Sequence, residues 1–182
     1  MALKPTIYKV TVNLSNIDRH YYDELQLTIA QHPSETVERM MVRLLAYCLQ
    51  AEASVEAELS FTKGLSTSEE PDLWLRSLDN QILHWIEVGQ PEPDRLKKGA
   101  NQAQQVSVYA FGKAADTWWQ LNGDVISALP KVTVYQFDWA DIQALSQLVA
   151  RTMELAVSIT ENTLYITAGE QTVEVPLACL SG

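Results

Sequence analysis

The chain has 182 residues and a formal net charge of −10, and its sequence pI is about 4.7. A single domain of this size, residues 1–182, buries about two thirds of its unfolded surface, so neither a disulfide nor a structural metal is needed to hold its core. The acidic charge disfavours a broad nucleic-acid surface, although it leaves room for a local basic cleft.

The segment Met1-Ala2-Leu3-Lys4-Pro5-Thr6 has a lysine and a proline where a signal peptide has its apolar stretch. The chain also has no run of about eighteen apolar residues, the length that a membrane helix needs. Cys48 and Cys179 lie outside any Cys-x-x-Cys or Cys/His cluster. We therefore expect a cytoplasmic protein with reduced thiols, without membrane insertion and without zinc.

Two strands and a long helix are predicted for the first third of the chain. Residues 6–14 alternate between apolar and polar, and Leu25, Leu27 and Ile29 repeat the pattern. This alternation predicts two half-buried antiparallel strands. The segment His32-Pro33-Ser34-Glu35 then provides a helix start, and apolar residues recur at helical spacing from Val37 to Leu49.

Short strands surround one helix in the middle third. Residues 58–61 and 72–75 have the pattern of short strands, and residues 82–88 are apolar on both faces. A strand that is apolar on both faces is typical of the centre of a sheet. A helix is predicted from Asp94 to about Ala103, with a further strand from Val106 to Phe111.

The last third returns to strands. Trp118, Trp119 and Leu121 predict a helix that closes near Asn122-Gly123. Residues 132–137 predict a strand, Asp138 a helix cap, and residues 142–149 the helix itself. Residues 155–159, 164–166 and 172–175 predict a β-meander. The whole pattern indicates an α+β fold, with a mixed β-sheet and flanking helices in a single domain.

Glu87 is a carboxylate within the apolar strand predicted at residues 82–88. Burying an ionised carboxylate alone costs several kcal/mol, so such a group is usually paired, protonated or bound to a metal. A divalent metal shared with Asp72 is one candidate partner. The other is the basic run Arg95-Leu96-Lys97-Lys98. The first alternative predicts an enzyme, and the second a structural ion pair.

Glu38 is the third candidate acid. At about 100° per residue, the centre of the helix's apolar stripe lies near Met41 and Cys48, and Glu38 lies at its edge about 80° away. Glu38 is therefore predicted to face a cleft, whereas Glu35 and Arg39 are predicted to point away from the stripe. The competing interpretation is that Glu38 is a solvated residue on the flank of the helix.

Together, Glu38, Asp72 and Glu87 could converge on one hard cation such as Mg²⁺, which prefers oxygen ligands. Such a metal lowers the pKa of a bound water and stabilises charge on a phosphoryl oxygen. Metal-dependent hydrolysis of a phosphodiester uses both of these effects. Convergence of the three carboxylates is the geometric condition on which the enzyme interpretation depends.

The order of Glu38 on a helix, Pro71-Asp72 and Glu87 on an apolar strand resembles the PD-(D/E)XK nuclease core. A more specific resemblance, to the YaeQ family, covers nearly the whole chain from Met1-Ala2-Leu3-Lys4 onward. It is carried by His32-Pro33-Ser34-Glu35-Thr36-Val37-Glu38-Arg39-Met40-Met41, Glu70-Pro71-Asp72-Leu73-Trp74, Trp85-Ile86-Glu87-Val88-Gly89 and Arg95-Leu96-Lys97-Lys98.

The resemblance implies a bacterial cytosolic protein with a PD-(D/E)XK restriction-endonuclease-like core and no established biochemical activity. It also implies that Asp72, Glu87 and the Val88 carbonyl are metal ligands and that Glu38 is the helix acid. The chain departs from the nuclease pattern at one position. The lysine expected two residues after Glu87 is replaced by Gly89.

A lysine from the next helix could replace the missing one. Arg95, Lys98 and Gln102 fall within about 60° of one another on that helix. Lys98 is predicted as the migrated catalytic lysine, with Arg95 and Gln102 as substrate-binding phosphate contacts or carboxylate contacts; a solvated basic face is the alternative.

Two functions are therefore expected, and the acidic charge alone suggests a third, a stability or assembly module whose surface binds a basic protein partner. One is a Mg²⁺-dependent nuclease-like phosphodiesterase that acts on nucleic acid through a local basic cleft. The alternative is a non-catalytic binding or regulatory protein that retains the nuclease-like fold. In the second case, Arg95 or Lys98 neutralises Glu87 in place of a metal.

Overall fold

The computed structural model describes residues 3–182, and within this range ten strands form one sheet in the order β2-β1-β8-β9-β10-β7-β6-β5-β4-β3. The strands are β1 (Thr6–Asn16), β2 (Tyr21–Gln31), β3 (Glu58–Phe61), β4 (Leu73–Arg76), β5 (Ile82–Val88), β6 (Ala103–Ala110), β7 (Val132–Phe137), β8 (Thr152–Thr160), β9 (Thr163–Ala168) and β10 (Gln171–Ser181). Met1 and Ala2, where the family resemblance begins, lie outside the described residues.

Over the same range there are four α-helices and two short 3₁₀ helices. They are α1 (Val37–Gln50), η1 (Ala51–Val55), η2 (Gly64–Ser66), α2 (Pro93–Gln102), α3 (Ala115–Ser127) and α4 (Trp139–Ser146). This arrangement confirms the predicted α+β class with a mixed sheet and flanking helices. None of the helices in residues 3–182 combines the length and the apolar composition that crossing a bilayer requires.

Several predicted bounds differ from the observed ones. Strands β3, β5 and β7 have the predicted limits. Helix α1 begins after Thr36, whose side chain accepts a hydrogen bond from the Arg39 N–H, so the N-cap is not within residues 32–35 as expected. Strand β6 starts directly after α2, at Ala103, and α3 extends from Ala115 to Ser127.

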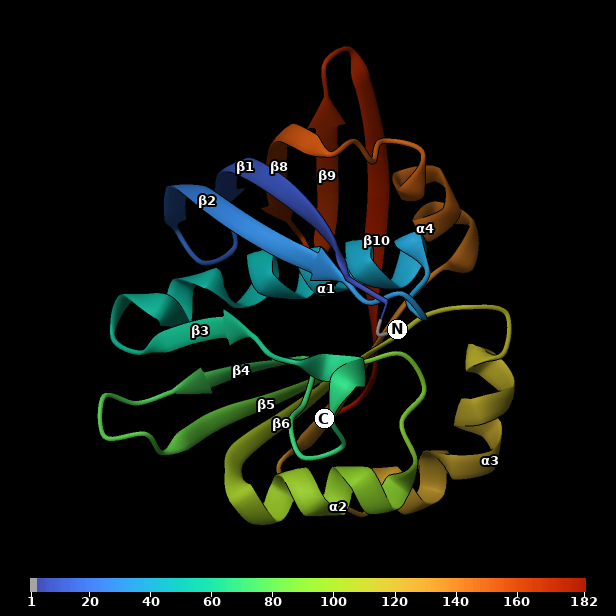
Figure 1. Cartoon of the computed structure of the whole chain (residues 1–182). Coiled ribbons are helices and arrows are strands. Elements are labelled where there is room, and N and C mark those ends of the chain that lie inside the picture. Colours follow the sequence, from blue (N-terminus) through green and yellow to red (C-terminus); the bar gives the residue numbers. More distant parts are fainter. Residues whose placement is uncertain (1–2) are drawn as a thin grey trace.

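Strand β10 joins the two halves of the sheet. Residues 171–176 pair with β9, and the chain from Leu177 onward pairs with β7. The change of partner occurs at Pro176, which has no backbone N–H to donate to a ladder. Figure 1 shows β10 running between a half that contains β1, β2, β8 and β9 and a half that contains β3 to β6.

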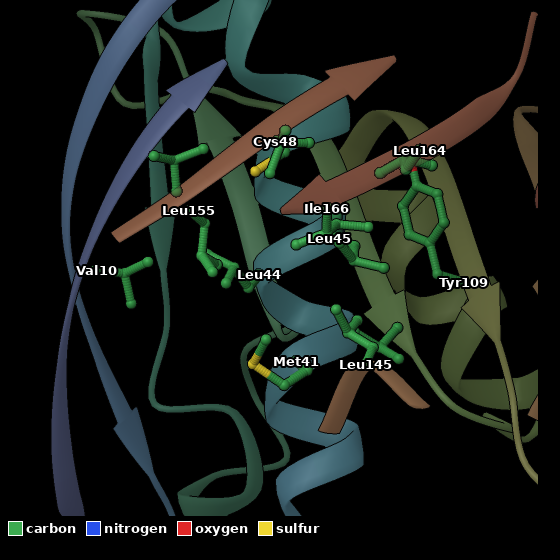
Figure 2. Close-up of a cluster of buried hydrophobic side chains, with 14 of the residues drawn as sticks. Val10, Met41, Leu44, Leu45, Cys48, Tyr109, Leu145, Leu155, Leu164 and Ile166 are labelled. Atoms are coloured by element: carbon green, nitrogen blue, oxygen red, sulfur yellow. The ribbon is translucent and has the colours of Figure 1, made fainter. Parts of the chain in front are cut away.

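Helix α1 lies inside the curve of this sheet (Figure 1). It contacts β2, β3, β5 and α4, and its residues from Met40 to Ala46 are buried without interruption. A helix that is buried on all sides differs from a surface helix, which buries one stripe. Figure 2 shows apolar side chains of α1 in a cluster with residues of β1, β6, α4, β8 and β9.

A second apolar cluster fills the opposite face of the sheet under α2 and α3. Its buried members are Trp85, Leu96, Ala103, Val106, Val108, Ala110, Trp118, Ile126, Val132 and Val134. Strand β5 therefore has apolar layers on both faces, as its sequence pattern predicts. Its C-terminal end is consequently within reach of side chains from α1 on one face and from α2 on the other.

Helix α2 packs closely on β5 through Gly99. A Cβ atom at this position would lie 2.9 Å from three atoms of the Trp85 ring, which is fully buried. Glycine is therefore required here for close approach, although it costs about 1 kcal/mol of helix propensity relative to alanine.

We expect Gly99→Ala to lower the free energy of unfolding by about 1–3 kcal/mol, because the added methyl group must displace a fully buried ring. Urea denaturation measures the change. Asn101→Ala is the matched control, since Asn101 is an exposed residue of the same helix and alanine favours helices. Equal unfolding midpoints for Gly99→Ala and the native chain would show that the ring can move aside at no cost.

Candidate functional site

The candidate site is a cleft of about 320 Å³ at the C-terminal end of β5. It lies between the loop that follows β3, the start of α2 and one side chain of α1. The lining residues are Arg39, Gly64, Leu65, Thr67, Ser68, Asp72, Glu87, Val88, Gln90, Pro91 and Arg95. The cleft therefore contains Asp72, Glu87, Val88 and Arg95 of the residues singled out in the sequence.

Asp72 is held at the floor of the cleft by β5. Its backbone N–H donates to the Ile86 carbonyl at 3.0 Å, which extends the β4–β5 ladder by one residue. Its Oδ2 accepts a hydrogen bond from the Val88 N–H at 2.8 Å. Its Oδ1 accepts one from Nη2 of Arg39 at 2.6 Å. Both oxygens of this buried carboxylate therefore have partners.

Glu87 is 3% exposed and accepts two hydrogen bonds at Oε1. Nε1 of Trp85 donates at 2.8 Å, and Nε of Arg95 donates at 2.7 Å. Burial, and next the charge of Asp72, raise the pKa of Glu87 to about 7, whereas Arg95 and Trp85 act to lower it. Glu87 is thus close enough to Asp72 for the two carboxylates to repel each other.

Arg39 connects three elements across the cleft. Its Nη1 donates to Oε2 of Glu35 at 2.7 Å, and its Nη2 donates to Asp72 and, at 3.4 Å, to the Val88 carbonyl. Glu35 is also paired with Arg43, which is almost fully buried. The acids Glu35, Asp72 and Glu87 are therefore matched by the guanidinium groups of Arg39, Arg43 and Arg95.

On α2, Arg95 lines the cleft, whereas Lys98 and Gln102 do not. The guanidinium of Arg95 also donates to the carbonyls of Ser68 and Glu70, at 3.1 and 2.7 Å. Lys98 does not line the cleft: its Nζ lies 3.0 Å from Oε2 of Glu69 and donates, at 3.4 Å, to the Ser68 carbonyl that Arg95 also contacts. The exposed side chain of Gln102 contacts the Lys98 carbonyl at 3.4 Å. Of the three predicted residues of α2, only Arg95 lines the cleft, and the roles predicted for Lys98 and Gln102 stay predictions.

At the start of α1, the residue that lines the cleft is Arg39 and not the predicted Glu38. Half-buried Glu38 does not line the cleft, while buried Glu35 and the adjacent Arg39 take part in the ion pairs. The prediction that Glu35 and Arg39 point away from the buried side of the helix was wrong. Glu35 precedes the helix, so helical spacing does not place it. Because α1 has no exposed side, Arg43 is buried and pairs with Glu35, which also pairs with Arg39. The spacing of Glu35, Arg39 and Arg43, four residues apart, was the signal for their pairing.

Gly89 has a positive φ of 104° at the end of β5, and its N–H donates to the Tyr109 carbonyl at 2.9 Å. L-residues rarely adopt this backbone conformation, whereas glycine does so readily. The backbone turn therefore accounts for glycine at the position where the nuclease pattern has lysine.

The arrangement does not fit a Mg²⁺ ion as it stands. Residues 3–182 contain no group of three or more His, Cys, Asp or Glu side chains that could hold a metal. Of the donors expected for the metal, Asp72 and the Val88 carbonyl both contact Nη2 of Arg39, and Glu87 is paired with Arg95. A guanidinium nitrogen thus occupies the point on which two of the expected ligands converge.

Comparison with known proteins identifies relatives over nearly the whole chain. The family model described as YaeQ protein matches residues 1–177. Proteins from Salmonella typhi and Escherichia coli (strain K12), each described as the uncharacterised protein YaeQ, are 39% identical over 97% of this chain and 96% of their own length.

Two crystal structures of YaeQ proteins share the fold. The protein from Xanthomonas axonopodis pv. citri has a TM-score of 0.91 and 34% identity over 98% of this chain and 99% of its own. The protein from Pseudomonas syringae has a TM-score of 0.91 and 38% identity over 98% of this chain and 97% of its own.

We expect Glu87→Gln to remove a pH dependence of stability. The folded pKa of about 7 lies above the ordinary value of 4.5, so the folded chain holds this proton more tightly than the unfolded chain. The fold should therefore lose stability as the pH rises from about 4.5 to 7. Urea midpoints of both chains between pH 4.5 and 8 measure the difference.

Subtracting the variant from the native chain cancels the opposite contribution of His84. Burial lowers the pKa of His84 to about 4, so its contribution to stability increases as the pH rises towards 6.5. Glu38→Gln, which removes a carboxyl group outside the cleft, should retain the native profile. If the urea midpoint of Glu87→Gln changes with pH as that of the native chain does, the pH dependence belongs to another group.

We expect Gly89→Lys to lower the free energy of unfolding by about 1–3 kcal/mol, because the positive φ strains any residue with a Cβ. Gly89→Ala is the matched variant and should lose the same amount, since nothing lies within 4 Å of a Cβ built at this position. Thermal unfolding of both variants gives the comparison. A stable Gly89→Lys beside a destabilised Gly89→Ala would contradict the backbone explanation.

Proposed function

This chain belongs to the YaeQ family, and we propose that it is a non-catalytic binding protein that keeps the carboxylate arrangement of a nuclease-like cleft and binds a phosphodiester strand. One observation carries the proposal. Glu87 is neutralised by Arg95 at 2.7 Å, the ion pair that distinguishes a binding protein from a metal enzyme in this pattern. The Arg39–Asp72 pair at 2.6 Å extends the same neutralisation to the second carboxylate.

The energetics of these ion pairs support the binding interpretation. Removing one partner from a buried ion pair costs about 3–5 kcal/mol, because the remaining charge is left without compensation. A Mg²⁺ ion that binds these carboxylates must compete with two arginines for them, and it also gives up its own hydration reluctantly. The missing lysine at Gly89 and the position of Lys98 outside the cleft remove a further component of catalysis.

The guanidinium groups of Arg39 and Arg95 still have N–H groups that can donate to an anion. A guanidinium has about five N–H groups, and Arg95 directs three hydrogen bonds to protein oxygens. Arg39 and Arg95 retain 18% and 28% exposure of their side chains at the cleft. Planar guanidinium groups match the geometry of phosphate oxygens, and Thr67, Ser68 and Gln90 surround them. A phosphodiester is therefore the favoured ligand class.

The second candidate function is that of a Mg²⁺-dependent phosphodiesterase. One observation favours it: Nη2 of Arg39 contacts both Asp72 and the Val88 carbonyl. A positively charged group therefore already lies at the point where these two predicted metal ligands meet. It is also favoured by the repulsion between Asp72 and Glu87, which a divalent cation would relieve. In this candidate Arg39 leaves Asp72, and Mg²⁺ becomes the cofactor. Catalytic roles for Glu38 and Lys98 would require their movement into the cleft.

Titration calorimetry with Mg²⁺ and Mn²⁺ tests the choice between these functions. We expect no saturable binding to the native chain with a Kd below about 1 mM, because the arginines hold the carboxylates. Arg39→Leu should gain binding, since it frees Oδ1 of Asp72 and the Val88 carbonyl. Arg19→Leu removes the same charge from an exposed residue outside the cleft and should leave the titration unchanged.

A labelled single-stranded oligonucleotide provides the second measurement. The native chain should bind it without cleaving it in Mg²⁺, and Arg95→Gln should weaken binding. Native binding of the metal below 1 mM, together with cleavage that Asp72→Asn abolishes, would overturn the binding proposal and establish the phosphodiesterase.

A further inference from the structure

A second hollow, of about 410 Å³, lies on the outer face of β3 and β4. Trp74 and Arg76 alternate along β4 with the buried residues Leu73 and Leu75, so they share this outer face. Helix α2 contacts β5 and β6, and the β4–β5 hairpin extends beyond it in Figure 1. The lining residues are Ser60, Phe61, Thr62, Lys63, Glu70, Trp74 and Arg76.

Arg76 is a half-buried cation without an anionic partner among residues 3–182. Its guanidinium carbon lies 4.8 Å from the centre of the Trp74 ring, and its Nε is buried without a hydrogen bond within that range. Glu58 faces Arg76 across the β3–β4 ladder and Glu70 lines the same hollow, yet neither forms an ion pair with it. Arg39, Arg43 and Arg95, by contrast, each contact a carboxylate.

The composition of this hollow matches the requirements of a nucleotide. An arginine stacked on an indole ring presents a flat cationic surface, on which an unpaired base can stack. The exposed side chain of Lys63 beside it can contact the adjoining phosphate. The lining carries two cations, Lys63 and Arg76, and one carboxylate, Glu70, which accepts a hydrogen bond from the backbone N–H of Lys63 at 3.0 Å. Arg76 and Lys63 thus bring two cations together in a chain whose net charge is −10, although Glu58 lies opposite Arg76 on β3.

The hollow shares no lining residue with the candidate cleft, but a third cavity shares residues with both. Thr62 and Lys63 also line a cavity of about 210 Å³, which includes Arg39. Arg39 and Gly64 line both that cavity and the candidate cleft. Cationic side chains therefore occur along three adjoining hollows around the loop that follows β3, from Arg76 through Lys63 and Arg39 to Arg95.

We propose that the Trp74–Arg76 face is a stacking site for single-stranded nucleic acid, which continues from there along Lys63 into the candidate cleft. This inference rests on the proposed phosphodiester binding and adds the type of strand and a second contact point. A single strand is required because only unpaired bases expose their faces for stacking on side chains. One base stacks on the Arg76 guanidinium, and its phosphate lies between Arg76 and Lys63.

Fluorescence anisotropy with fluorescein-labelled 12-nucleotide oligo-dT and oligo-U, in EDTA, tests the site without dependence on a metal or on turnover. We expect Arg76→Gln and Trp74→Ala each to raise the Kd about tenfold. Trp74→Phe should retain most of the affinity, because it keeps an aromatic ring beneath the arginine. Lys63→Gln should weaken binding and reduce the slope of log K against log salt by about 1.

Two control variants match these charge changes outside the three hollows. Arg151 also lies over an aromatic ring, at 5.7 Å from Tyr8, and Lys9 is exposed on β1. Arg151→Gln and Lys9→Gln should bind as the native chain does. Thermal unfolding of each variant establishes that it is folded at the assay temperature.

The inference is overturned if the folded Arg76→Gln variant binds like Arg151→Gln, or if the native chain binds duplex DNA or inorganic polyphosphate as tightly as oligo-dT. If Arg95→Gln weakens binding while Arg76→Gln does not, the proposed cleft function stands and the stacking site fails. If Arg76→Gln weakens binding but the chain also cleaves the strand in Mg²⁺, the stacking site stands and the non-catalytic proposal fails.

Discussion

The burial of a carboxylate at the end of β5 is the constraint around which this region of the structure is organised. Glu87 cannot remain charged in an apolar layer without partners. Its partners come from Arg95 on α2 and from Trp85 on its own strand. Trp85 can lie beneath α2 because Gly99 leaves room for its ring. The same arginine holds the carbonyls of Ser68 and Glu70, so the position of the cleft wall also depends on this one charge.

A second set of charges anchors the cleft from the opposite face of the sheet. Helix α1 is enclosed by the curved sheet, and it brings Arg43 into an interior where only a paired charge is tolerated. Glu35 satisfies Arg43 and also orients Arg39, which extends to Asp72. The two carboxylates that resemble a metal site are therefore each held by a guanidinium, one from either side of β5. This balanced arrangement is the basis of the proposal that the cleft binds an anionic ligand.

Much of the fold could be predicted from the sequence because its strands have strong local patterns. The β5 segment is apolar on both faces because it is covered on both faces, and β1 alternates because one of its faces is open. The site was harder to predict. The helical-wheel argument for Glu38 assumes a surface helix with one buried stripe, whereas α1 is buried all round and Glu35 lies before its first turn. Arg95 and Lys98 are one turn apart, and the reach of each side chain depends on the loop at Ser68, which no periodicity describes.

The dual pairing of β10 also has a consequence for the order in which the chain can fold during synthesis. Strand β1 pairs in parallel with β8, more than a hundred residues later, and β10, which follows both, joins the two halves of the sheet. Contacts between such distant residues close large loops and slow folding. Until β10 emerges from the ribosome, β7 and β9 lack a neighbour between them, and the enclosure of α1 remains incomplete. Before β10 is available, the nascent chain therefore carries exposed strand edges, a period in which protection by chaperones would matter most.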